Sequence, residues 1–179
     1  GTTIEVVLPV APGENVIQPG EDVRAGDPVL EAGHRLRPQD LGGLLALGIT
    51  TVRVARRPRV AIVSTGDELV TPNETPAPGQ VRDVNTYTIA ALTAEAGGEP
   101  VPVGIVPDDY EAQQQAARRG LEQGDILIFS AGSSVSVRDM TADVFNSLGQ
   151  PGVLVHGITL RPGKPSIVAL LNGVPAFGL

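Results

Sequence analysis

The stretch from Asp125 to Leu148 constrains the fold more than any other part of the sequence. It opens with the apolar run Ile126–Phe129, a pattern typical of a strand buried on both faces. Small residues follow at 130–134, and the pattern predicts a helix over Met140–Leu148 that ends at Gly149. A strand, a small-residue loop and a helix can form a plain tight turn. The same arrangement can also bind an anion through backbone amides near the helix start.

Two more strand–helix pairs precede this one. The pattern predicts strands over Arg59–Ser64 and Val101–Val106, and helices over 84–96 and 110–123. Strands that alternate with helices favour an α/β domain with a mainly parallel sheet and helices on both faces. Because the crossovers are right-handed, the carboxyl ends of these strands should share one edge, where ligands bind in open α/β sheets.

The sequence on either side of these pairs is richer in β patterns. After them, a strand is predicted over Val153–Leu160, and Asn172-Gly173 predicts a hairpin between 166–171 and 174–177. Before them, the sequence predicts a small β-rich unit with one helix. Its expected elements are strands over 3–10, 28–36 and 50–54, turns at 12–15, 18–22 and 24–27, and a helix over 38–47. We therefore expect two parts, 1–55 and 56–179, joined at the connection 56–58.

Composition narrows the possible chemistry. The chain has 179 residues, a net charge of −7, no cysteine and two histidines. Disulfides and thiolate metal sites are excluded, so a metal site must rely on carboxylates, which favours a hard cation such as Mg²⁺. No basic stripe predicts a nucleic-acid surface, no apolar run is long enough to cross a bilayer, and no signal peptide is visible at the start.

Polar residues collect where the predicted strands end. The residues expected at this shared edge are Thr65, Gly66, Asp67, Glu68, Asp108, Asp109, Ser130 to Ser134, Asp139, Arg161 and Lys164. Two like charges about 4 Å apart repel by about 4 kcal/mol at an effective dielectric constant of about 20. Carboxylates beside a phosphate cradle therefore favour a divalent cation between them.

Each of these residues also has a purely structural interpretation. Asp67 and Glu68 suit a surface turn, and Asp108 or Asp109 suits the start of the helix over 110–123. Asp139 could cap its own helix, and Arg161 and Lys164 could be solvated turn residues. His34 and His156 are expected to pack within their segments, and no serine–histidine–acid triad can be assembled.

Four motifs taken together resemble a known family. They are STGDEL at 64–69, GQVRDVN at 79–85, SAGSSVSVRD at 130–139 and RPGKP at 161–165. In this order they resemble the molybdopterin molybdenumtransferases, namely MoeA and the E domain of gephyrin, and the segment 13–49 resembles the upstream part of MoeA.

The resemblance implies a MogA-like three-layer α/β domain that binds molybdopterin. The implied reaction is Mg²⁺-dependent insertion of molybdate into adenylylated molybdopterin, with loss of AMP, in a cytoplasmic homodimer. The implied catalytic residues are Glu68, Asp108 and Asp139, and the implied metal ligands are these three and Asp109. The implied substrate-binding residues are Thr65, Gly66, Asp83, Asn85, Gly132, Ser133, Ser134, Arg161 and Lys164. Arg161 stands where the family usually has lysine, which keeps the charge and changes the geometry.

The resemblance also implies that this chain is a fragment. The family has further N-terminal helices and continues past the final Gly-Leu into a small β-barrel domain, so the chain alone is expected to bind weakly and to be inactive. Two alternatives remain: a MogA-type adenylyltransferase or CinA-like nucleotide hydrolase, and a gephyrin-like scaffold without catalysis. The upstream block 2–54 favours the transferase, because the MogA-type enzymes lack it.

Overall fold

The computed structural model describes the chain apart from residues 6, 131–134, 160 and 162, and describes only the backbone of residues 135–138. It divides into two compact units, Gly1–Val54 and Ala55–Leu179. No helix among the described residues is long and apolar enough to span a membrane.

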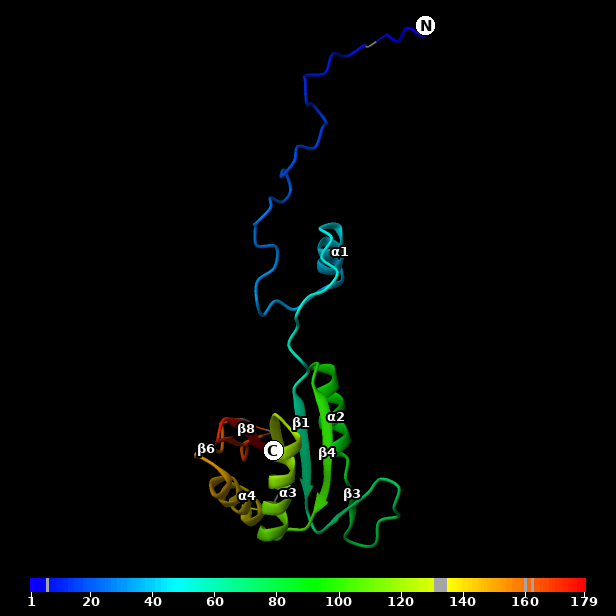
Figure 1. The fold of residues 1–179 in the computed structure, drawn as a ribbon. Coiled ribbons are helices and arrows are strands. Elements are labelled where there is room, and N and C mark those ends of the chain that lie inside the picture. The colour runs from blue at the N-terminus through cyan, green and yellow to red at the C-terminus, as the bar shows by residue number, and fades with distance from the viewer. Residues whose placement is uncertain (6, 131–134, 160, 162) are drawn as a thin grey trace. The chain divides into compact units, whose positions relative to one another are not determined.

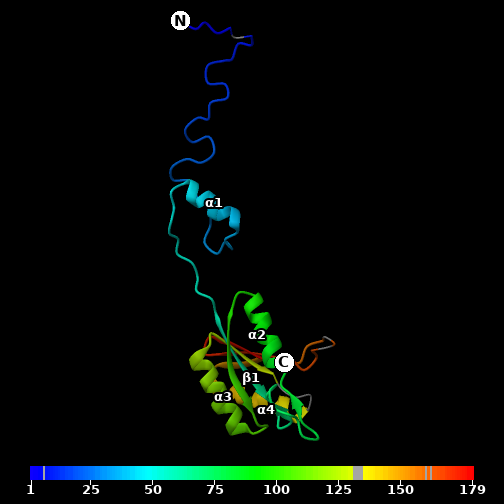
Figure 2. The same ribbon diagram turned by 90° about the vertical axis from the view of Figure 1, so that its right-hand side faces the viewer.

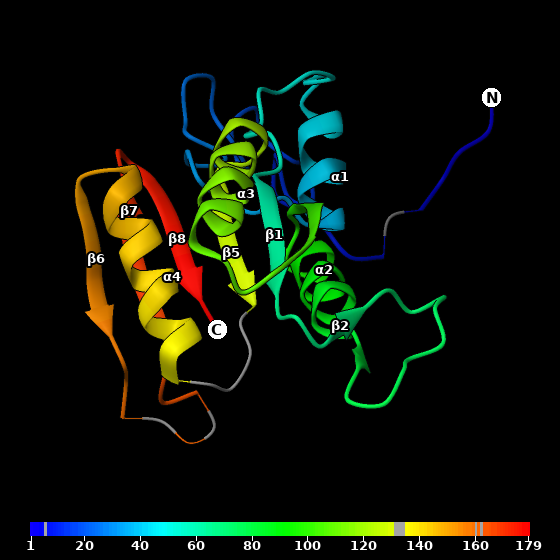
Figure 3. The same cartoon turned by 90° about the horizontal axis from the view of Figure 1, so that it is seen from below.

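The second unit is built on a six-stranded sheet with the order β4-β1-β5-β8-β7-β6 (Figure 1). The strands are β1 (Arg59–Thr65), β4 (Glu99–Val106), β5 (Ile126–Ser130), β6 (Pro151–His156), β7 (Ile167–Leu171) and β8 (Val174–Gly178). Strands β4, β1, β5 and β8 pair in parallel, and β7 is antiparallel to both of its neighbours. The arrowheads of β1, β5, β8 and β6 therefore point the same way in Figure 3, and the predicted mainly parallel sheet is confirmed.

Helices cover both faces of this sheet. Helix α2 (Asn85–Glu95) packs on β1 and β4, and α3 (Tyr110–Gln123) packs on β1, β4 and β5. Figure 2 shows α2 and α3 on opposite sides of β1. Helix α4 (Val135–Leu148) contacts α3 and lies over β6, β7 and β8, so it shares the face of α3.

The core lies between the sheet and helices α3 and α4. Its largest fully buried apolar side chains include Phe129 and Phe145, whose rings meet edge to face with centroids 5.4 Å apart. Gly120 of α3 permits close packing, because a Cβ there would lie 2.5 Å from Leu127 Cδ1. The continuous apolar strands predicted from the sequence thus form the centre of the sheet.

Several element boundaries agree with the sequence. Helix α3 and the hairpin of β7 and β8 occur where they were predicted, and Asn172 and Gly173 take φ values of 50° and 92° in the turn. Helix α4 begins earlier than predicted, at Val135 instead of Met140. Serine and valine are weak helix formers, so helix propensity gave no signal for this first turn. A small additional sheet pairs β2 (Leu69–Val70) with β3 (Val81–Arg82).

The first unit differs from the β-rich unit that the sequence predicted. Its described residues contain helix α1 (Pro38–Ala46), as expected, and no strand. The predicted turns are present: in the turn at 11–14 the Glu14 amide donates to the Ala11 carbonyl, and the Ala11 amide donates to Glu14 Oε2. A strand needs a partner to satisfy its backbone groups, and β propensity at 3–10 and 50–54 cannot supply one. His34, expected to pack, instead contacts Asp40 Oδ2 at 2.8 Å.

Candidate functional site

The carboxyl edge of the parallel strands is the natural place for a site. From β1 the chain crosses through α2 to β4 on one side, whereas from β5 it crosses through α4 toward the other side. The point between β1 and β5 is therefore the topological switch point, where open α/β sheets bind ligands. Figure 3 shows the ends of these two strands next to each other.

A polar network holds α2 against this switch point. Ser64, near the end of β1, donates to Asp83 Oδ1 at 3.2 Å and lies 2.7 Å from Thr86 Oγ1. Asp83 is only 4% exposed and also accepts from the Thr86 amide at 3.1 Å. Asn85 is the first residue of α2, and its Nδ2 donates to Ser130 Oγ at 2.9 Å. The resemblance assigns Asp83 and Asn85 to substrate binding; in the structure they connect α2 to the ends of β1 and β5.

Three carboxylates gather where β1 and β4 end. The Asp108 amide donates to Asp67 Oδ1 at 3.2 Å, and the Gly66 amide donates to the Val106 carbonyl at 3.1 Å. These bonds hold the exit of β1 against the exit of β4. Glu68 folds back over the same turn, because a Cβ at Gly66 would lie 2.6 Å from its Oε2.

Asp108 is the most perturbed of these acids. Burial raises the pKa of its carboxyl group, and the nearby negative charges of Asp67 and Glu68 raise it further. Its Oδ1 is buried and has no hydrogen-bond partner. A buried carboxylate surrounded by like charges is stabilised by a cation, and Mg²⁺ needs only one or two carboxylates alongside substrate phosphates. Within the described part of the chain, no group of three or more His, Cys, Asp or Glu side chains is arranged to hold a metal ion without such help.

The neighbouring Asp109 has a different role. It is the N-cap of α3, and its Oδ1 accepts from the Ala112 amide at 2.9 Å. The structure therefore separates the two adjacent aspartates that the sequence left open: Asp108 faces the acidic group, and Asp109 caps the helix.

Asp139 lies farther along the same edge. Its carboxylate is 3.9 Å from His156 Nε2, at the end of β6, and both side chains are partly exposed. Strand β6 is four positions from β1 in the sheet, which at about 4.8 Å per strand is roughly 19 Å. Asp139 and Glu68 thus share one edge, but the structure does not gather them around a single cation.

The two basic residues predicted for the site lie in the loop between β6 and β7. Arg161 and Lys164 are exposed there, at the same edge, and the Lys164 carbonyl accepts from the Ile158 amide at 2.8 Å. The predicted phosphate-loop residues Gly132, Ser133 and Ser134 lie outside the described residues.

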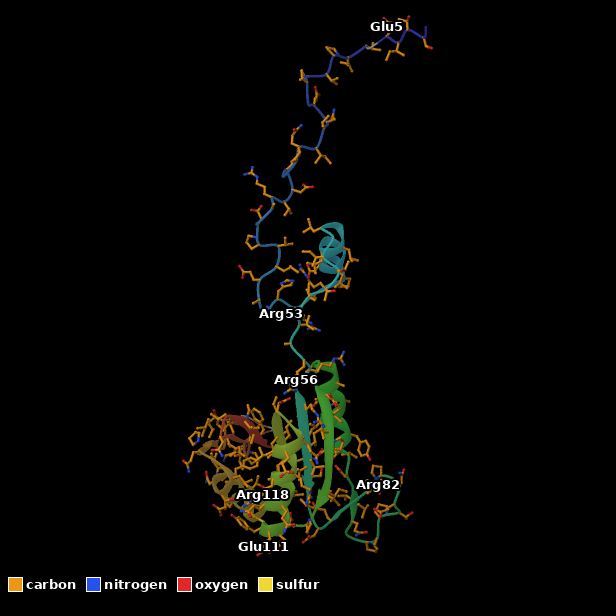
Figure 4. All side chains as sticks on the ribbon, in the orientation of Figure 1. Glu5, Arg53, Arg56, Arg82, Glu111 and Arg118 are labelled. Atoms are coloured by element: carbon orange, nitrogen blue, oxygen red, sulfur yellow. The ribbon has the colours of Figure 1, made fainter. Side chains whose placement is uncertain are left out.

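Sequence reasoning missed three contributors to this edge. Ser64 and Thr86 complete the network around Asp83, and Gln113 is a buried amide in the first turns of α3. A hydroxyl within an apolar strand and a glutamine on the inner face of a helix were the available signals. At the opposite end of the strands, Arg56 forms a two-pronged ion pair with Asp125. Figure 4 shows Arg56 at that end, away from Arg82 and Glu111.

Comparison with known proteins relates the chain to a protein family. A family model described as a probable molybdopterin binding domain matches residues 61–179, and one described as the MoeA N-terminal region (domain I and II) matches residues 2–48. A solved MoeA molybdopterin biosynthesis protein from Pyrococcus horikoshii superposes with a TM-score of 0.75 at 38% identity, over 89% of this chain and 39% of that one. A structure of molybdenum cofactor biosynthesis protein B, with a TM-score of 0.51 and 21% identity, shares the fold.

Curated relatives give the same result. A protein named molybdopterin molybdenumtransferase from Nostoc sp. is 39% identical over 165 residues, which is 92% of this chain and 38% of that protein. Its namesake from Haemophilus influenzae is 38% identical over 168 residues, or 94% of this chain and 41% of that protein. The chain thus spans about 40% of the length of these relatives. It belongs to the family of the probable molybdopterin binding domain, and its residues 2–48 match the MoeA N-terminal region.

Proposed function

We propose that the protein containing this chain is a molybdopterin molybdenumtransferase of molybdenum cofactor biosynthesis. It inserts molybdate into adenylylated molybdopterin and releases AMP. Residues 56–179 are its MogA-like molybdopterin-binding domain and residues 1–55 are part of its MoeA N-terminal region. The observation that carries the proposal is the convergence of the exits of β1 and β4, the end of β5 and the β6–β7 loop on one edge of the sheet.

The uncharged residues at the switch point between β1 and β5 would hold the substrate. At the switch point, Thr65 and Gly66 lie where β1 leaves the sheet, and Ser130, which accepts from Asn85, pairs with the preceding Ser64. Glycine at 66 leaves space for the Glu68 carboxylate to fold back over the turn. In this proposal the substrate phosphate approaches the backbone amides of the loop that contains Gly132, Ser133 and Ser134.

The acidic part would bind the cation. Glu68 and Asp108 would hold Mg²⁺ together with substrate oxygens, and Asp67 adds negative charge to the same turn. When bound there, Mg²⁺ would polarise the phosphoanhydride of the adenylylated substrate. Asp109 supports this part by fixing the start of α3.

The basic loop would bind oxyanions. Arg161 and Lys164 present positive charge at the same edge, where molybdate and the departing phosphate both need it. Asp139, beside His156, lies next to this loop and would act at the molybdate end of the site. The proposal places the protein in the cytoplasm as a homodimer, a state that sedimentation of the full-length protein would test.

Molybdate-dependent release of AMP from adenylylated molybdopterin, measured with the full-length protein, tests the proposal. We expect Glu68→Ala and Asp108→Ala to lower the rate at least a hundredfold, and removal of Mg²⁺ to have a similar effect (roughly 2.7 kcal/mol at 1.36 kcal/mol per tenfold). Glu95→Ala, at an exposed residue near the end of α2, is the matched control. Wild-type rates in both acidic variants would contradict the proposed site.

A further inference from the structure

Among the described residues, three side chains at the carboxyl edge have buried polar atoms without a hydrogen-bond partner. They are Thr65, through Oγ1; Asp108, through Oδ1; and Gln113, through both Oε1 and Nε2. Thr65 is 1% exposed and Gln113 is 0% exposed. A buried polar group without a partner costs about 1–3 kcal/mol, so each requires a physical explanation.

Gln113 and Asp108 occupy paired positions at the start of α3. With Asp109 as the N-cap, Asp108 is the residue before the cap and Gln113 is the fourth residue of the helix. In many helices an apolar side chain before the cap packs against an apolar side chain at that fourth position. Here both places are polar, Gln113 is fully buried and Asp108 is partly buried, so the two side chains occupy positions that commonly pack against each other.

Thr65 lies on the same side of the sheet. Gly120 packs on Ala61 and Leu127, so Ala61 faces α3, and alternation along β1 makes Thr65 face α3 as well. Gln113 precedes Gly120 by seven residues, roughly 10 Å of helix, and the four strand residues from Ala61 to Thr65 span roughly 13 Å. Because α3 runs antiparallel to β1, these lengths place Gln113 near the level of the last residues of β1, on the face where Thr65 lies.

We infer that Gln113 is a positioning residue for the proposed cation site. The Gln113 amide and the inner oxygen of Asp108 are unpaired without the cation. When a divalent cation binds beside Glu68, the Gln113 side-chain amide donates to the inner oxygen of Asp108, and the other carboxylate oxygen is presented to the cation. Thr65 adds a buried hydroxyl, Oγ1, which also lacks a hydrogen-bond partner. The inference rests on the proposed function and adds a residue that the motifs of the sequence did not include.

The experiment measures Mg²⁺ binding to the chain by calorimetry in the presence of AMP, whose phosphate supplies oxygens that the two carboxylates alone do not provide. Gln113→Leu removes the amide and keeps the side-chain volume, and Gln115→Leu makes the same change at an exposed position of the same helix. Removing a group that orients a metal ligand typically weakens metal binding 10–100-fold, which we expect for Gln113→Leu and not for Gln115→Leu. The melting temperature of Gln113→Leu should equal or exceed that of the unchanged chain, because leucine removes two unpaired buried groups.

A second measurement uses the unchanged chain. The ¹H–¹⁵N signals of the Gln113 side-chain amide should shift as Mg²⁺ is added, and this shift should be absent in Asp108→Ala. Equal Mg²⁺ affinity in Gln113→Leu and the unchanged chain, or an amide signal that does not respond, would overturn the inference and leave the proposed function in place. If the unchanged chain bound no Mg²⁺ at millimolar concentration with AMP present, both this inference and the proposed cation site would be wrong.

Discussion

Adjacent residues of one type can have unrelated roles, as Asp108 and Asp109 illustrate. Asp109 faces solvent and its carboxylate accepts the Ala112 amide, whereas Asp108 is partly buried beside two other acids. Helix capping and ligand binding were both possible for each residue on sequence grounds. The direction of each side chain, which depends on where the helix begins, decides between them.

The two roles predict opposite outcomes on substitution. Asp109→Ala should lower the free energy of unfolding by about 1 kcal/mol, because the Ala112 amide loses its acceptor, and should leave Mg²⁺ affinity nearly unchanged. Urea unfolding together with calorimetry would measure both quantities. Asp109→Ser, which can still cap the helix, is the control and should keep most of the stability. A large loss of Mg²⁺ affinity in Asp109→Ser would show that Asp109 is a ligand after all.

Asp125 gives a pH prediction at the other end of the strands. Hydrogen bonds from Arg56 and from the Arg59 amide lower the pKa of its carboxyl group to about 2, below an ordinary value near 4. The pair therefore stabilises the fold above about pH 4, and this contribution is lost as the pH falls from about 4 through about 2. Unfolding measured across this range should be less pH-dependent in Asp125→Asn than in the unchanged chain. Asp143→Asn, at an exposed residue of α4, should follow the unchanged chain; equal slopes in all three would contradict the prediction.

Among the elements, α2 depends on side-chain bonds more than on its own sequence. Its N-cap residue, Val84, makes no capping bond with its side chain, and Asp83 instead accepts the Thr86 amide from one residue earlier. Ser64 of β1 joins the same carboxylate. The network thus both starts the helix and attaches it to the sheet.

Asp83→Ala should therefore destabilise the unit by about 1–3 kcal/mol, because the buried Thr86 amide loses its acceptor. Asp83→Asn keeps an acceptor oxygen and should keep most of the stability. Denaturant unfolding would measure both variants, and molybdopterin binding should fall only as far as α2 is displaced. If Asp83→Ala were as stable as the unchanged chain and yet lost binding, the residue would act on the substrate directly, as the family resemblance implies.

The sequence predicted correctly those elements whose ends are marked by capping or turn residues. Helix α3 has a capping aspartate and a terminal glycine, and the β7–β8 hairpin has Asn172-Gly173, so both could be placed from sequence. The acidic turn, formed by Asp67, Glu68 and Asp108, could be anticipated because parallel strands leave a sheet at one edge. The role of Gln113 could not, because it depends on which face of α3 meets the sheet. The strands expected in residues 3–10 and 50–54 failed because strand formation depends on a partner that sequence periodicity does not identify.

At the scale of the whole molecule, the two units contribute very differently to stability. The hydrophobic core cluster draws all of its residues from the second unit, from Ala61 to Ala176. Among the described residues of the first unit, only Leu44 is a buried large apolar side chain, and several others, including Ile4 and Val7, are mostly exposed. The hydrophobic driving force for folding, which scales with buried apolar area, is therefore concentrated in residues 55–179.

This distribution predicts that residues 55–179 fold without the first unit. A protein of these residues should unfold in one cooperative transition, with a midpoint within a few degrees of the 179-residue chain, and should bind Mg²⁺ with the same affinity, because the acidic turn and Gln113 belong to this unit. Residues 1–54 alone should show little cooperative unfolding. Calorimetry and circular dichroism of the two pieces would measure these properties. Loss of the cooperative transition in 55–179 would mean that the sheet requires contacts from the first unit, and weaker Mg²⁺ binding by a folded 55–179 would mean that the acidic turn is not complete within the second unit.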